Sequence, residues 1–456
     1  MHAAPSSLLD VASRVDTRLE ALLAVERERW SKVDADLIPP IDEIARLVLA
    51  GGKRLRPAFC FWGFVGAGGD PTDELVIDAG AALELLHAFA LFHDDVMDGS
   101  LTRRGEPTTN AKFEASHGEN TLAGESRRFG DGVAILVGDL AYVYSDQLMR
   151  DASPQAWTIW NELRIELNFG QYLDMLGSAM NERRREKAER ICRYKSGKYT
   201  IERPLHLGAL LAAPTRGDEL IPVLSTYGLP LGDAFQMRDD VLGAFGDTAI
   251  TGKPVGDDLR EGKPTPLMAI ATARASASQL TELQLVGNQD LTAAQIARVQ
   301  EVIRETGALD ELESVITRLT DEAIAAVQNV PFAQSVRDEL IRLAEYVSWR
   351  TVYRIPDLDG RVYSMAVTIR IPTTLRPLSG GASTVSVEGS TLADVLAALN
   401  AVHPGFADRL FDEAGNLHKF VNIFVSDDDV RYLDGLNTKV PAGETVSIIP
   451  AVAGGC

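Results

Sequence analysis

The spacing of apolar residues changes once along the chain and divides it into two parts. From about Ser7 to Tyr353, apolar residues recur with helical spacing, as in DAGAALELLHAFALFHDDVMD and AAQIARVQEVIRET. We find no convincing run of alternating residues that would indicate strands in this part. The pattern predicts an all-α core built from many long helices.

The spacing changes near RIPDLDGRVYSM, where proline, aspartate and glycine interrupt the helical pattern. MAVTIRIP then alternates, with Val367, Ile369 and Ile371 on one face. STVSVEG, KFVNIFVSDDDV and TVSIIPAV have the features of further strands, and STLADVLAALN has those of a helix capped by Ser390 or Thr391. This order predicts a small α+β sheet domain.

Length supports this division, because 456 residues exceed one ordinary domain. We expect a helical domain over 1–355, a linker over 356–364 and a small sheet domain over 365–456. Met365 stands at the start of the small domain, as if a separate gene had been joined there.

Composition narrows the setting in which the protein works. Neither a stretch of eighteen uncharged apolar residues nor a signal-like N-terminus is present, so we expect a cytoplasmic protein without a membrane span. Cys60, Cys192 and Cys456 lie far apart, which argues against a disulfide framework or a cysteine zinc site. The net charge of -20 disfavours binding to nucleic acid. An anionic substrate would therefore need local basic clusters or metal ions.

Two acidic motifs each follow an apolar run. In HDDVMDG, Asp94 and Asp98 share one helix face, and Asp95 adds a neighbouring carboxylate. FQMRDDVLGAFGD repeats the pattern with Asp239 and Asp240. A solvated helix end is the simpler interpretation of one such motif. Two motifs after buried helices instead indicate Mg²⁺, held by a few carboxylates and by substrate phosphates.

Basic residues occur near both motifs. They are Lys53, Arg54 and Arg56 in GGKRLRP, Arg103 and Arg104 in LTRRGEP, Lys195 and Lys198 in YKSGKYT, and Lys253 and Lys263 in TGKPVGDDLREGKPTP. Any one of them alone is explained as a surface charge. Beside carboxylates that bind Mg²⁺, they indicate diphosphate binding.

Residues 40–353 resemble the trans-isoprenyl diphosphate synthases, the family of farnesyl and geranylgeranyl diphosphate synthases. The resemblance rests on GGKRLRP, ELLHAFALFHDDVMD, TRRGEP, ILVGDL, FGQYLD, YKSGKYT, FQMRDDVLG and GKPVGDDLREGKPT, which stand in the order of the family. It implies an isoprenoid-synthase bundle of antiparallel helices around a deep cavity, and a homodimer.

The resemblance also implies the chemistry and the site residues. The substrates would be isopentenyl diphosphate and an allylic diphosphate (dimethylallyl, geranyl or farnesyl), with three Mg²⁺ ions per active site. The metal ligands would be Asp94, Asp98 and Asp239, supported by Asp95 and Asp240. The allylic diphosphate would be held by Arg103, Lys195 and Lys253, and isopentenyl diphosphate by Lys53, Arg56, His87 and Arg104. Three further residues would steady the reacting centre or close over it: Ser196, Gln236 and Lys263.

One position departs from the family pattern. Many relatives carry a third aspartate in the second motif, where this chain has Gly243. Asp247 follows one turn later, but we do not expect it to bind metal directly. We therefore expect the outer metal ion to be held less tightly.

The residues before the first motif bear on product length. Phe89 and Ala90 lie five and four residues before Asp94, which places them about 6–7.5 Å deeper along a helix. In the family, an aromatic residue at the position of Phe89 is the floor of the product cavity. With no insertion in DDVMD, the chain resembles the enzymes that make the C20 product, geranylgeranyl diphosphate. Farnesyl diphosphate (C15) is the next alternative, and Phe89 as ordinary core packing is the simplest one.

Residues 365–456 resemble the ubiquitin-like sulfur carriers with the β-grasp fold, related to MoaD and ThiS, and most of all the carrier of protein-bound cysteine synthesis. The resemblance rests on VTIRIPTTLRPLSGG, LHKFVNIFVSDDDVRYLDGLNTKV and VSIIPAVAGG. It implies that Gly454 and Gly455 form a reactive tail, whose carboxylate an adenylating enzyme activates before sulfur transfer. Cys456 follows Gly455, so the chain as written cannot be activated.

Three explanations of Cys456 remain open. A zinc metalloprotease removes it, it represents the cysteine adduct made with a cysteine synthase, or it is a relic. The thiol could also crosslink two chains.

Two other functions of the chain also remain as rivals: a carrier protein whose helical half is an inactive scaffold, and a terpene cyclase. The intact acidic and basic motifs argue against the first, and GGKRLRP with His87 argues against the second.

Overall fold

The chain folds into two compact units, one ending at Ser348 and the other beginning at Trp349. The computed structural model describes residues 5–103, 105–246, 256–349, 366–372, 375–379, 384–389, 391–411, 417–418, 421–425, 428–430, 435–440 and 445–450. Several positions singled out in the sequence lie outside these ranges: Arg104, Asp247, Lys253, the linker 356–364, Gly454, Gly455 and Cys456.

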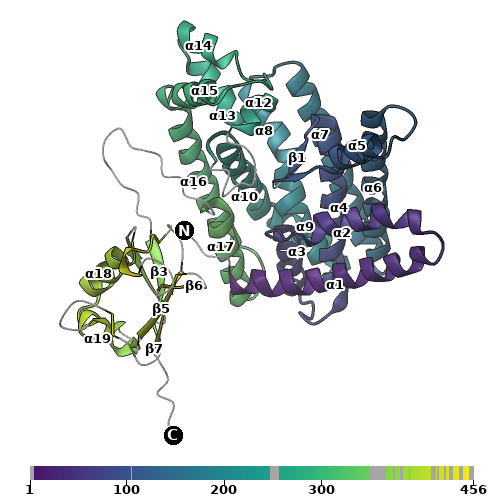
Figure 1. Cartoon of the computed structure of the whole chain (residues 1–456). Helices are drawn as coiled ribbons and strands as arrows, with labels where there is room; N and C mark the ends of the chain where they lie inside the picture. The colour runs from purple at the N-terminus through teal and green to yellow at the C-terminus, as the bar shows by residue number, and fades with distance from the viewer. Residues whose placement is uncertain are drawn as a thin grey trace. The chain divides into compact units, whose positions relative to one another are not determined.

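The first unit is a helical bundle, as the spacing of apolar residues predicted (Figure 1). Its principal helices are α1 (Ser6–Ser31), α2 (Ile38–Leu49), α3 (Leu55–Gly66), α4 (Glu74–Asp98), α5 (Thr109–Glu119), α6 (Ser126–Leu148), α7 (Pro154–Ala179), α8 (Arg185–Cys192), η2 (Arg193–Glu202), α9 (Arg203–Ala212), α10 (Gly217–Phe245), α12 (Asp257–Glu261), α13 (Pro266–Arg274), α14 (Ala277–Leu283), α15 (Ala293–Glu305), α16 (Ala308–Val327) and α17 (Gln334–Trp349). The expectation of no strands needs a small correction, because β1 (Thr102–Arg103) and β2 (Glu106–Pro107) form a short hairpin after α4.

Helix α4 forms the centre of this bundle and packs against α3 and α6. In the part of the chain that the structure describes, it is the one helix long and apolar enough to cross a membrane. Most of its apolar stretch is buried inside the protein, however, as in the core helix of a folded domain. The same apolar composition therefore anchors the acidic motif at the end of α4 in the protein core.

The end of α4 is fixed by Gly99, which takes the left-handed conformation with φ 66°. Glycine adopts this conformation without the strain of a Cβ atom, so it is a common residue at a helix C-terminus. Asp94, Asp95 and Asp98 consequently occupy the last turns of α4. The negative end of the helix dipole disfavours anions there, so this arrangement favours a nearby cation.

Two glycines allow the helices behind the acidic motif to approach closely. A Cβ atom on Gly170 of α7 would lie 2.4 Å from the backbone nitrogen of Lys195 in η2. On the other side of η2, a Cβ atom on Gly197 would lie 2.9 Å from the carbonyl carbon of Gly232 in α10. The segment η2 is a π-helix, a conformation often found at functional sites. It carries Lys195 between α7 and α10.

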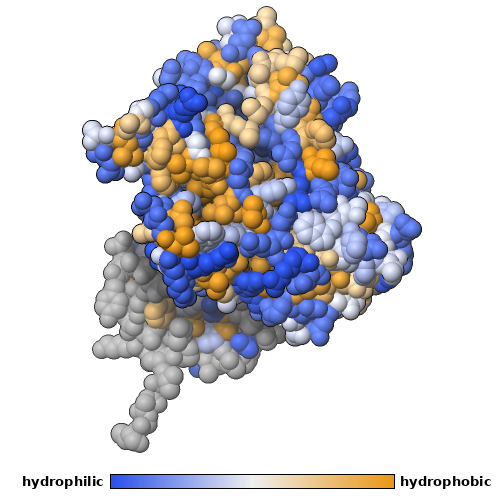
Figure 2. Space-filling model, turned by 90° about the vertical axis from the view of Figure 1, so that its right-hand side faces the viewer, coloured by the Kyte–Doolittle hydropathy of each residue, from blue (hydrophilic) through white to orange (hydrophobic). Residues whose placement is uncertain are grey.

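Large apolar side chains remain exposed on α6 and α7. We call this set the α6–α7 apolar face, and it consists of Phe129, Ile135, Leu136, Val143, Ile165, Phe169, Tyr172, Met175 and Leu176. Leu136 is 67% exposed and Phe169 is 63% exposed. Figure 2 views the molecule from the right-hand side of Figure 1 and shows apolar side chains gathered on that side. Exposed apolar groups of this extent are typical of an interaction surface.

The second unit contains a five-stranded mixed sheet in the order β4-β3-β7-β5-β6. Its strands are β3 (Ala366–Arg370), β4 (Thr384–Glu388), β5 (Val421–Val425), β6 (Asp428–Asp429) and β7 (Thr445–Pro450). Strand β3 runs antiparallel to β4 and parallel to β7, with Ile369 opposite Val446. Val367, Ile369 and Ile371 are buried on one face, as their alternation predicted.

Helix α18 (Leu392–Val402) packs with this sheet and shares its apolar core. Thr391 caps the helix: its hydroxyl accepts from the Asp394 amide, and the Asp394 carboxylate accepts from the Thr391 amide. This reciprocal capping box settles the choice between Ser390 and Thr391. The α+β prediction for this unit is confirmed, and the fold is consistent with a β-grasp domain.

Candidate functional site

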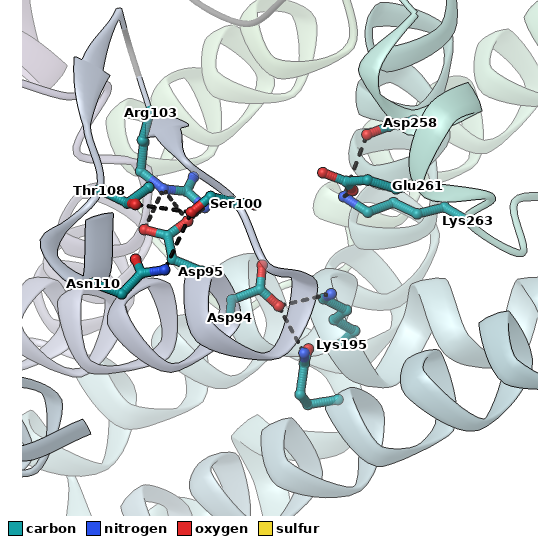
Figure 3. A network of polar contacts seen from close by, with 11 residues as sticks. Asp94, Asp95, Ser100, Arg103, Thr108, Asn110, Lys195, Asp258, Glu261 and Lys263 are labelled. Carbon is teal, nitrogen blue, oxygen red and sulfur yellow. Dashed lines mark hydrogen bonds and ion pairs between the residues drawn. The ribbon is translucent and has the colours of Figure 1, made fainter. Parts of the chain in front are cut away.

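The carboxylate of Asp94 lies at the centre of a polar network that joins α4, α7 and η2 (Figure 3). Asp94 Oδ1 accepts from Gln171 Nε2 at 2.7 Å and lies 3.3 Å from Lys195 Nζ. The same ammonium lies 2.5 Å from Asp174 Oδ2. Burial opposes ionisation of Asp94, but the charges of Lys195 and Lys263 outweigh burial and lower the pKa of Asp94. Asp94 is therefore held as a carboxylate.

Asp98, one turn further along α4, has a different electrostatic environment. Burial and the neighbouring Asp94 charge raise the pKa of Asp98 to about 7, although Lys263 and Lys195 oppose this shift. Burial is the larger cause of this shift, and the repulsion between the two carboxylates adds to it. Such a pair is suited to binding a further cation.

Arg103 in the β1–β2 hairpin pairs with Asp95. Its Nε and Nη2 atoms donate to Asp95 Oδ1 at 3.0 and 2.6 Å. Burial lowers the pKa of Arg103, but hydrogen bonding and charge interaction with Asp95 outweigh burial and raise it overall. Figure 3 shows Asp95 turned toward Arg103, beside Ser100, whereas Asp94 lies toward Lys195. Asp95 thus anchors the hairpin to α4, and diphosphate binding by Arg103 stays a prediction.

The second acidic motif lies in the last turns of α10. Asp240 is buried, accepts from Gln236 Nε2 at 2.8 Å, and lies 3.5 Å from Cys192 Sγ. Burial raises the pKa of Asp240 to about 8, and the charges of Asp258 and Asp239 act in the same direction. Gln236 thus donates to a carboxylate one turn along its own helix, and its place at the reacting centre stays a prediction.

Lys263 connects the two acidic motifs. Its ammonium lies 2.6 Å from Glu261 Oε2 and 3.3 Å from Asp258 Oδ1. Burial disfavours its charge, but these two carboxylates, followed by Asp94 and Asp98, raise its pKa well above the ordinary value. Asp258 in turn acts on Asp240. Lys263 and Asp258 thus link the end of α4 electrostatically to the end of α10.

The structure explains the departure at Gly243. A Cβ atom at this position would lie 1.7 Å from Asp258 Oδ2 and 2.3 Å from its carboxyl carbon. The Asp258 carboxylate therefore occupies the space beside α10 in which a side chain at position 243 would begin. Asp247, one turn beyond Gly243 in the sequence, lies outside the described residues.

A second polar group forms around Tyr199 in η2. The guanidinium carbon of Arg56, in the first turn of α3, lies 4.3 Å from the Tyr199 ring centroid. The His87 ring on α4 lies 6.1 Å from the same ring. Tyr199 is buried, so its ring holds Arg56 by a cation–π contact in a protected environment. Arg56 and His87, both expected to bind isopentenyl diphosphate, are thus brought together.

The remaining predicted residues divide into three groups. Ser196 is half-buried beside Lys195, and Phe89 is half-buried on α4, with its ring 4.8 Å from that of Tyr142. Lys53 is exposed in the loop before α3. Arg104 and Lys253, as well as the tail glycines Gly454 and Gly455, lie outside the described residues.

Several residues of these two polar groups were not assigned from the sequence, although they lie in motifs that were recognised. They are Gln171 and Asp174 in FGQYLD, Tyr199 in YKSGKYT, and Asp258 and Glu261 in GDDLREGK. Within FGQYLD and GDDLREGK, the polar residues are spaced i, i+3 and so share a helix face. That spacing was the signal available in the sequence.

The donor set fits Mg²⁺. Carboxylate oxygens are the hard ligands that Mg²⁺ prefers, and a second carboxylate acts on each of Asp98 and Asp240, namely Asp94 and Asp258. In the described ranges, no group of three or more histidine, cysteine, aspartate or glutamate side chains forms a cage for one ion. A site that takes only one or two carboxylates per ion, and completes its shell with phosphate and water, agrees with both findings.

Both parts of the chain match known protein families. Residues 39–305 match the polyprenyl synthetase family, and residues 369–455 match the ThiS family. A geranylfarnesyl diphosphate synthase of Aeropyrum pernix is 31% identical over 306 residues, covering 65% of this chain and 89% of the relative. A geranylgeranyl diphosphate synthase of Mycobacterium tuberculosis is 31% identical over 308 residues, covering 66% of this chain and 81% of the relative.

A solved structure agrees with these relatives. It is a geranylgeranyl pyrophosphate synthase from Corynebacterium glutamicum in complex with isoprenyl diphosphate and magnesium. It is 38% identical to this chain, has a TM-score of 0.71, and the match covers 75% of this chain and 99% of that one. With this fold, and with a family match over more than half of its length, the chain belongs to the polyprenyl synthetase family of prenyltransferases.

Proposed function

We propose that the helical unit is a Mg²⁺-dependent prenyltransferase that condenses isopentenyl diphosphate with allylic diphosphates to geranylgeranyl diphosphate. The observation that carries this proposal is the meeting of ammonium and carboxylate groups between α4 and α10. Lys195 Nζ lies 3.3 Å from Asp94 on α4, and Lys263 Nζ lies 3.3 Å from Asp258. The Asp258 carboxylate in turn lies against α10 at Gly243. Carboxylates for metal ions and ammonium groups for phosphate oxygens are the groups that a diphosphate requires.

The protein residues have separate roles in this proposal. Lys195 and Lys263 bind the allylic diphosphate, while Arg56 and His87 bind isopentenyl diphosphate beside Tyr199. Asp94, Asp98 and Asp239 hold Mg²⁺, which when bound stabilises the charge of the departing diphosphate. We include three ions per site, and diphosphate contacts by Lys53, Arg103, Arg104 and Lys253, with Ser196 and Gln236 close to the reacting centre.

The reaction needs no protein nucleophile. The allylic carbon–oxygen bond breaks and its electron pair leaves with the diphosphate. The isopentenyl double bond then forms the new carbon–carbon bond, and a proton passes to the released diphosphate. The apolar side chains of the bundle protect the allylic cation by excluding water.

Phe89 supports the C20 product within this proposal. Its ring on α4 packs against His93 and Tyr142, so the depth available below the acidic motif is limited. The named relatives include both geranylgeranyl and geranylfarnesyl synthases, so their names alone do not select one chain length. Farnesyl diphosphate is the second candidate product.

A homodimer is also part of the proposal. The α6–α7 apolar face exposes large side chains such as Leu136 and Phe169, which water solvates poorly. Burying this face against the same face of a second copy gives a two-fold symmetric interface. Exposed apolar area and family membership together support this arrangement in a cytoplasmic enzyme.

For the sheet unit we propose a sulfur-carrier role, supported by its ThiS-family match and its mixed sheet. The cysteine-biosynthesis carrier remains our specific proposal, with an adenylating enzyme, a cysteine synthase and a metalloprotease as partners of the tail. Intact-mass measurement of protein from cells tests processing. Loss of Cys456 supports it, and full retention contradicts it.

Incubation of the full chain with Mg²⁺, isopentenyl diphosphate and each allylic primer tests the transferase directly, with product length read by mass spectrometry. We expect condensation that stops mainly at C20, and Asp94→Ala should abolish it. Absence of condensation with every primer would overturn the transferase proposal and favour the scaffold alternative. Retained turnover in Asp94→Ala would remove Asp94 from the metal site.

A further inference from the structure

Lys198 of η2 is paired with a carboxylate of α7, and the proposed reaction leaves this lysine without a role. Its Nζ donates to Glu166 Oε1, and the two side chains are only 14% and 12% exposed. Arg203, the first residue of α9, donates to the same carboxylate through Nε and Nη2, both at 2.7 Å. Burial raises the pKa of Glu166, but the hydrogen bonds from Arg203 and Lys198 outweigh burial and lower it overall. We call these three residues the η2 clamp.

The two cations of the η2 clamp are five residues apart, which is the repeat of a π-helix. The Arg203 N–H donates to the Lys198 carbonyl, the i to i+5 bond that defines this helix type. Residues joined in this way lie one turn apart on the same face of the helix. In an α-helix, residues five apart would instead point about 140° away from each other. A carboxylate that binds both Lys198 and Arg203 therefore favours the π-helical register over the α-helical one.

The end of η2 is also held from α10. Lys198 Nζ lies 3.8 Å from Glu202 Oε2, and Glu202 Oε1 accepts from Ser225 Oγ of α10 at 2.6 Å. A Cβ atom on Gly228 of α10 would lie 2.9 Å from the Glu202 Cα atom, so the two backbones are in close contact. Because separating buried ion pairs leaves a charge without its partner, these contacts resist a change of register at this end of η2.

The same helix carries residues of both proposed substrate subsites. Lys195, near the start of η2, lies 3.3 Å from Asp94. Tyr199, the residue directly after Lys198, lies under the guanidinium of Arg56. An α-helical turn holds about one residue fewer than a π-helical turn, so a change of register would turn Lys195 by about 100° relative to α9. The contacts of Lys195 and Tyr199 therefore both depend on the register of η2.

We propose that Glu166, Lys198 and Arg203 are positioning residues that keep η2 in its π-helical register. They thereby place Lys195 for the allylic diphosphate and Tyr199 for isopentenyl diphosphate at the same time. Lys198 acts through Glu166 and does not bind a phosphate group itself. This inference rests on the proposed prenyltransferase activity and on the assignment of Lys195 and Tyr199 to the two subsites.

Steady-state kinetics of the full chain tests the η2 clamp, with each substrate varied in turn. Glu166→Gln and Lys198→Met should each raise the KM for both substrates by about 5-fold or more, because both subsites shift together. The double variant should be no worse than either single variant, since the first substitution already opens the clamp. Lys198→Arg keeps a cation beside Glu166 and should restore the wild-type KM values.

Lys112→Met is the matched control. Glu43 of α2 also binds one lysine and one arginine, Lys112 and Arg46, so this variant removes the same ammonium from a similar cluster away from η2. It should leave both KM values unchanged.

Hydrogen exchange measured by mass spectrometry tests the register without requiring activity. Peptides covering 193–203 should exchange about 10-fold faster in Glu166→Gln and in Lys198→Met than in the wild type, and at the wild-type rate in Lys112→Met. If Glu166→Gln folds poorly, Lys198→Met gives the same comparison, because methionine retains the apolar stem of the lysine.

The outcomes separate this inference from the proposed function. If the wild type makes no product, the transferase proposal fails, and the exchange of 193–203 alone supports or overturns the clamp. If Lys198→Met raises a KM and Glu166→Gln does not, Lys198 binds phosphate directly and the clamp is overturned. Clamp variants that lower only kcat, with both KM values unchanged, also overturn it, since a smaller folded fraction has the same effect. Unchanged exchange in both clamp variants would show that the register of η2 does not depend on Glu166 and Lys198.

Discussion

The carboxylate of Asp258 fills the space in which a side chain at position 243 would begin. A Cβ atom on Gly243 would lie 1.7 Å from Asp258 Oδ2, far inside van der Waals contact. Asp258 also lies 3.3 Å from Lys263 Nζ and adds to the negative charge around Asp240. The glycine and the distant aspartate are therefore complementary, and the acidic motif on α10 gains a carboxylate from outside its own helix.

This relationship predicts that Gly243→Asp is harmful in the native background. The new side chain must displace Asp258, so we expect the free energy of unfolding to fall by about 1–3 kcal/mol, as for other overpacked sites. Chemical denaturation, with turnover measured against Mg²⁺ concentration, checks this expectation.

Asp258→Ala supplies the control for that prediction. Removing the Asp258 carboxylate makes room at position 243. Gly243→Asp should therefore lower the free energy of unfolding less in Asp258→Ala than in the wild type. The double variant should also need less Mg²⁺ for half-maximal turnover than Asp258→Ala alone. If Gly243→Asp lowers the free energy of unfolding equally in the wild type and in Asp258→Ala, the two positions do not compete for space.

The positions of the acidic motifs could be predicted because they follow from local rules. Helical spacing alone places Asp94 and Asp98 on one face, and Gly99 ends the helix directly after them. The contact between Gly243 and Asp258 could not be predicted in this way. It depends on the path of the chain from α10 to α12, which no periodic pattern records.

The roles of neighbouring basic residues also could not be distinguished from the sequence. Arg54 and Arg56 stand two apart in GGKRLRP and look equivalent in the sequence. In the structure Arg54 is buried and lies 2.5 Å from Glu84 and 2.7 Å from Asp16, so it holds helices together. Arg56 instead lies over the Tyr199 ring. Only tertiary packing distinguishes a structural arginine from a candidate ligand-binding one.

Substitutions of Lys195 and Arg56 should each raise the KM for a different substrate. Lys195→Gln removes an ammonium that lies 3.3 Å from Asp94, so the KM for the allylic diphosphate should rise about 10-fold or more. Arg56→Gln should instead raise the KM for isopentenyl diphosphate. Steady-state kinetics with each substrate varied in turn measures both effects. If either variant raises both constants equally, the assignment of separate subsites is wrong.

His206 should make the helical unit sensitive to acid. Burial, with the charges of Arg203 and Lys198, lowers the pKa of His206 from 6.5 to about 3. Between these values the unfolded chain binds a proton that the folded chain does not. The contribution of the neutral His206 ring to the free energy of unfolding is thus complete above pH 6.5. It declines by about 1.4 kcal/mol per pH unit as pH falls toward 3.

Denaturant unfolding across this pH range checks the expected slope. In His206→Gln the free energy of unfolding should fall less steeply with falling pH. The difference in slope should be at most about 1.4 kcal/mol per pH unit, the contribution of one proton. His403→Gln lies in the sheet unit and should leave the unfolding of the helical unit unchanged. An identical pH slope in wild type and His206→Gln would refute the role of this buried imidazole.

Gly170 should be required for the position of Lys195. A Cβ atom there would lie 2.4 Å from the backbone nitrogen of Lys195, so Gly170→Ala must push η2 away from α7. That shift lengthens the contacts of Lys195 with Asp94 and Asp174, and we expect kcat to fall at least 10-fold.

Gly132→Ala on α6 is the matched control for this substitution. A Cβ atom at Gly132 meets no other atom within 4 Å, so the same chemical change should raise helix stability by about 0.5–1 kcal/mol and leave kcat unchanged. Turnover and thermal unfolding measured on both variants separate the effect of close packing from the effect of replacing a helical glycine. A wild-type kcat in Gly170→Ala would mean that η2 can move without disturbing Lys195, and the close approach of α7 would then have no role in placing that ammonium.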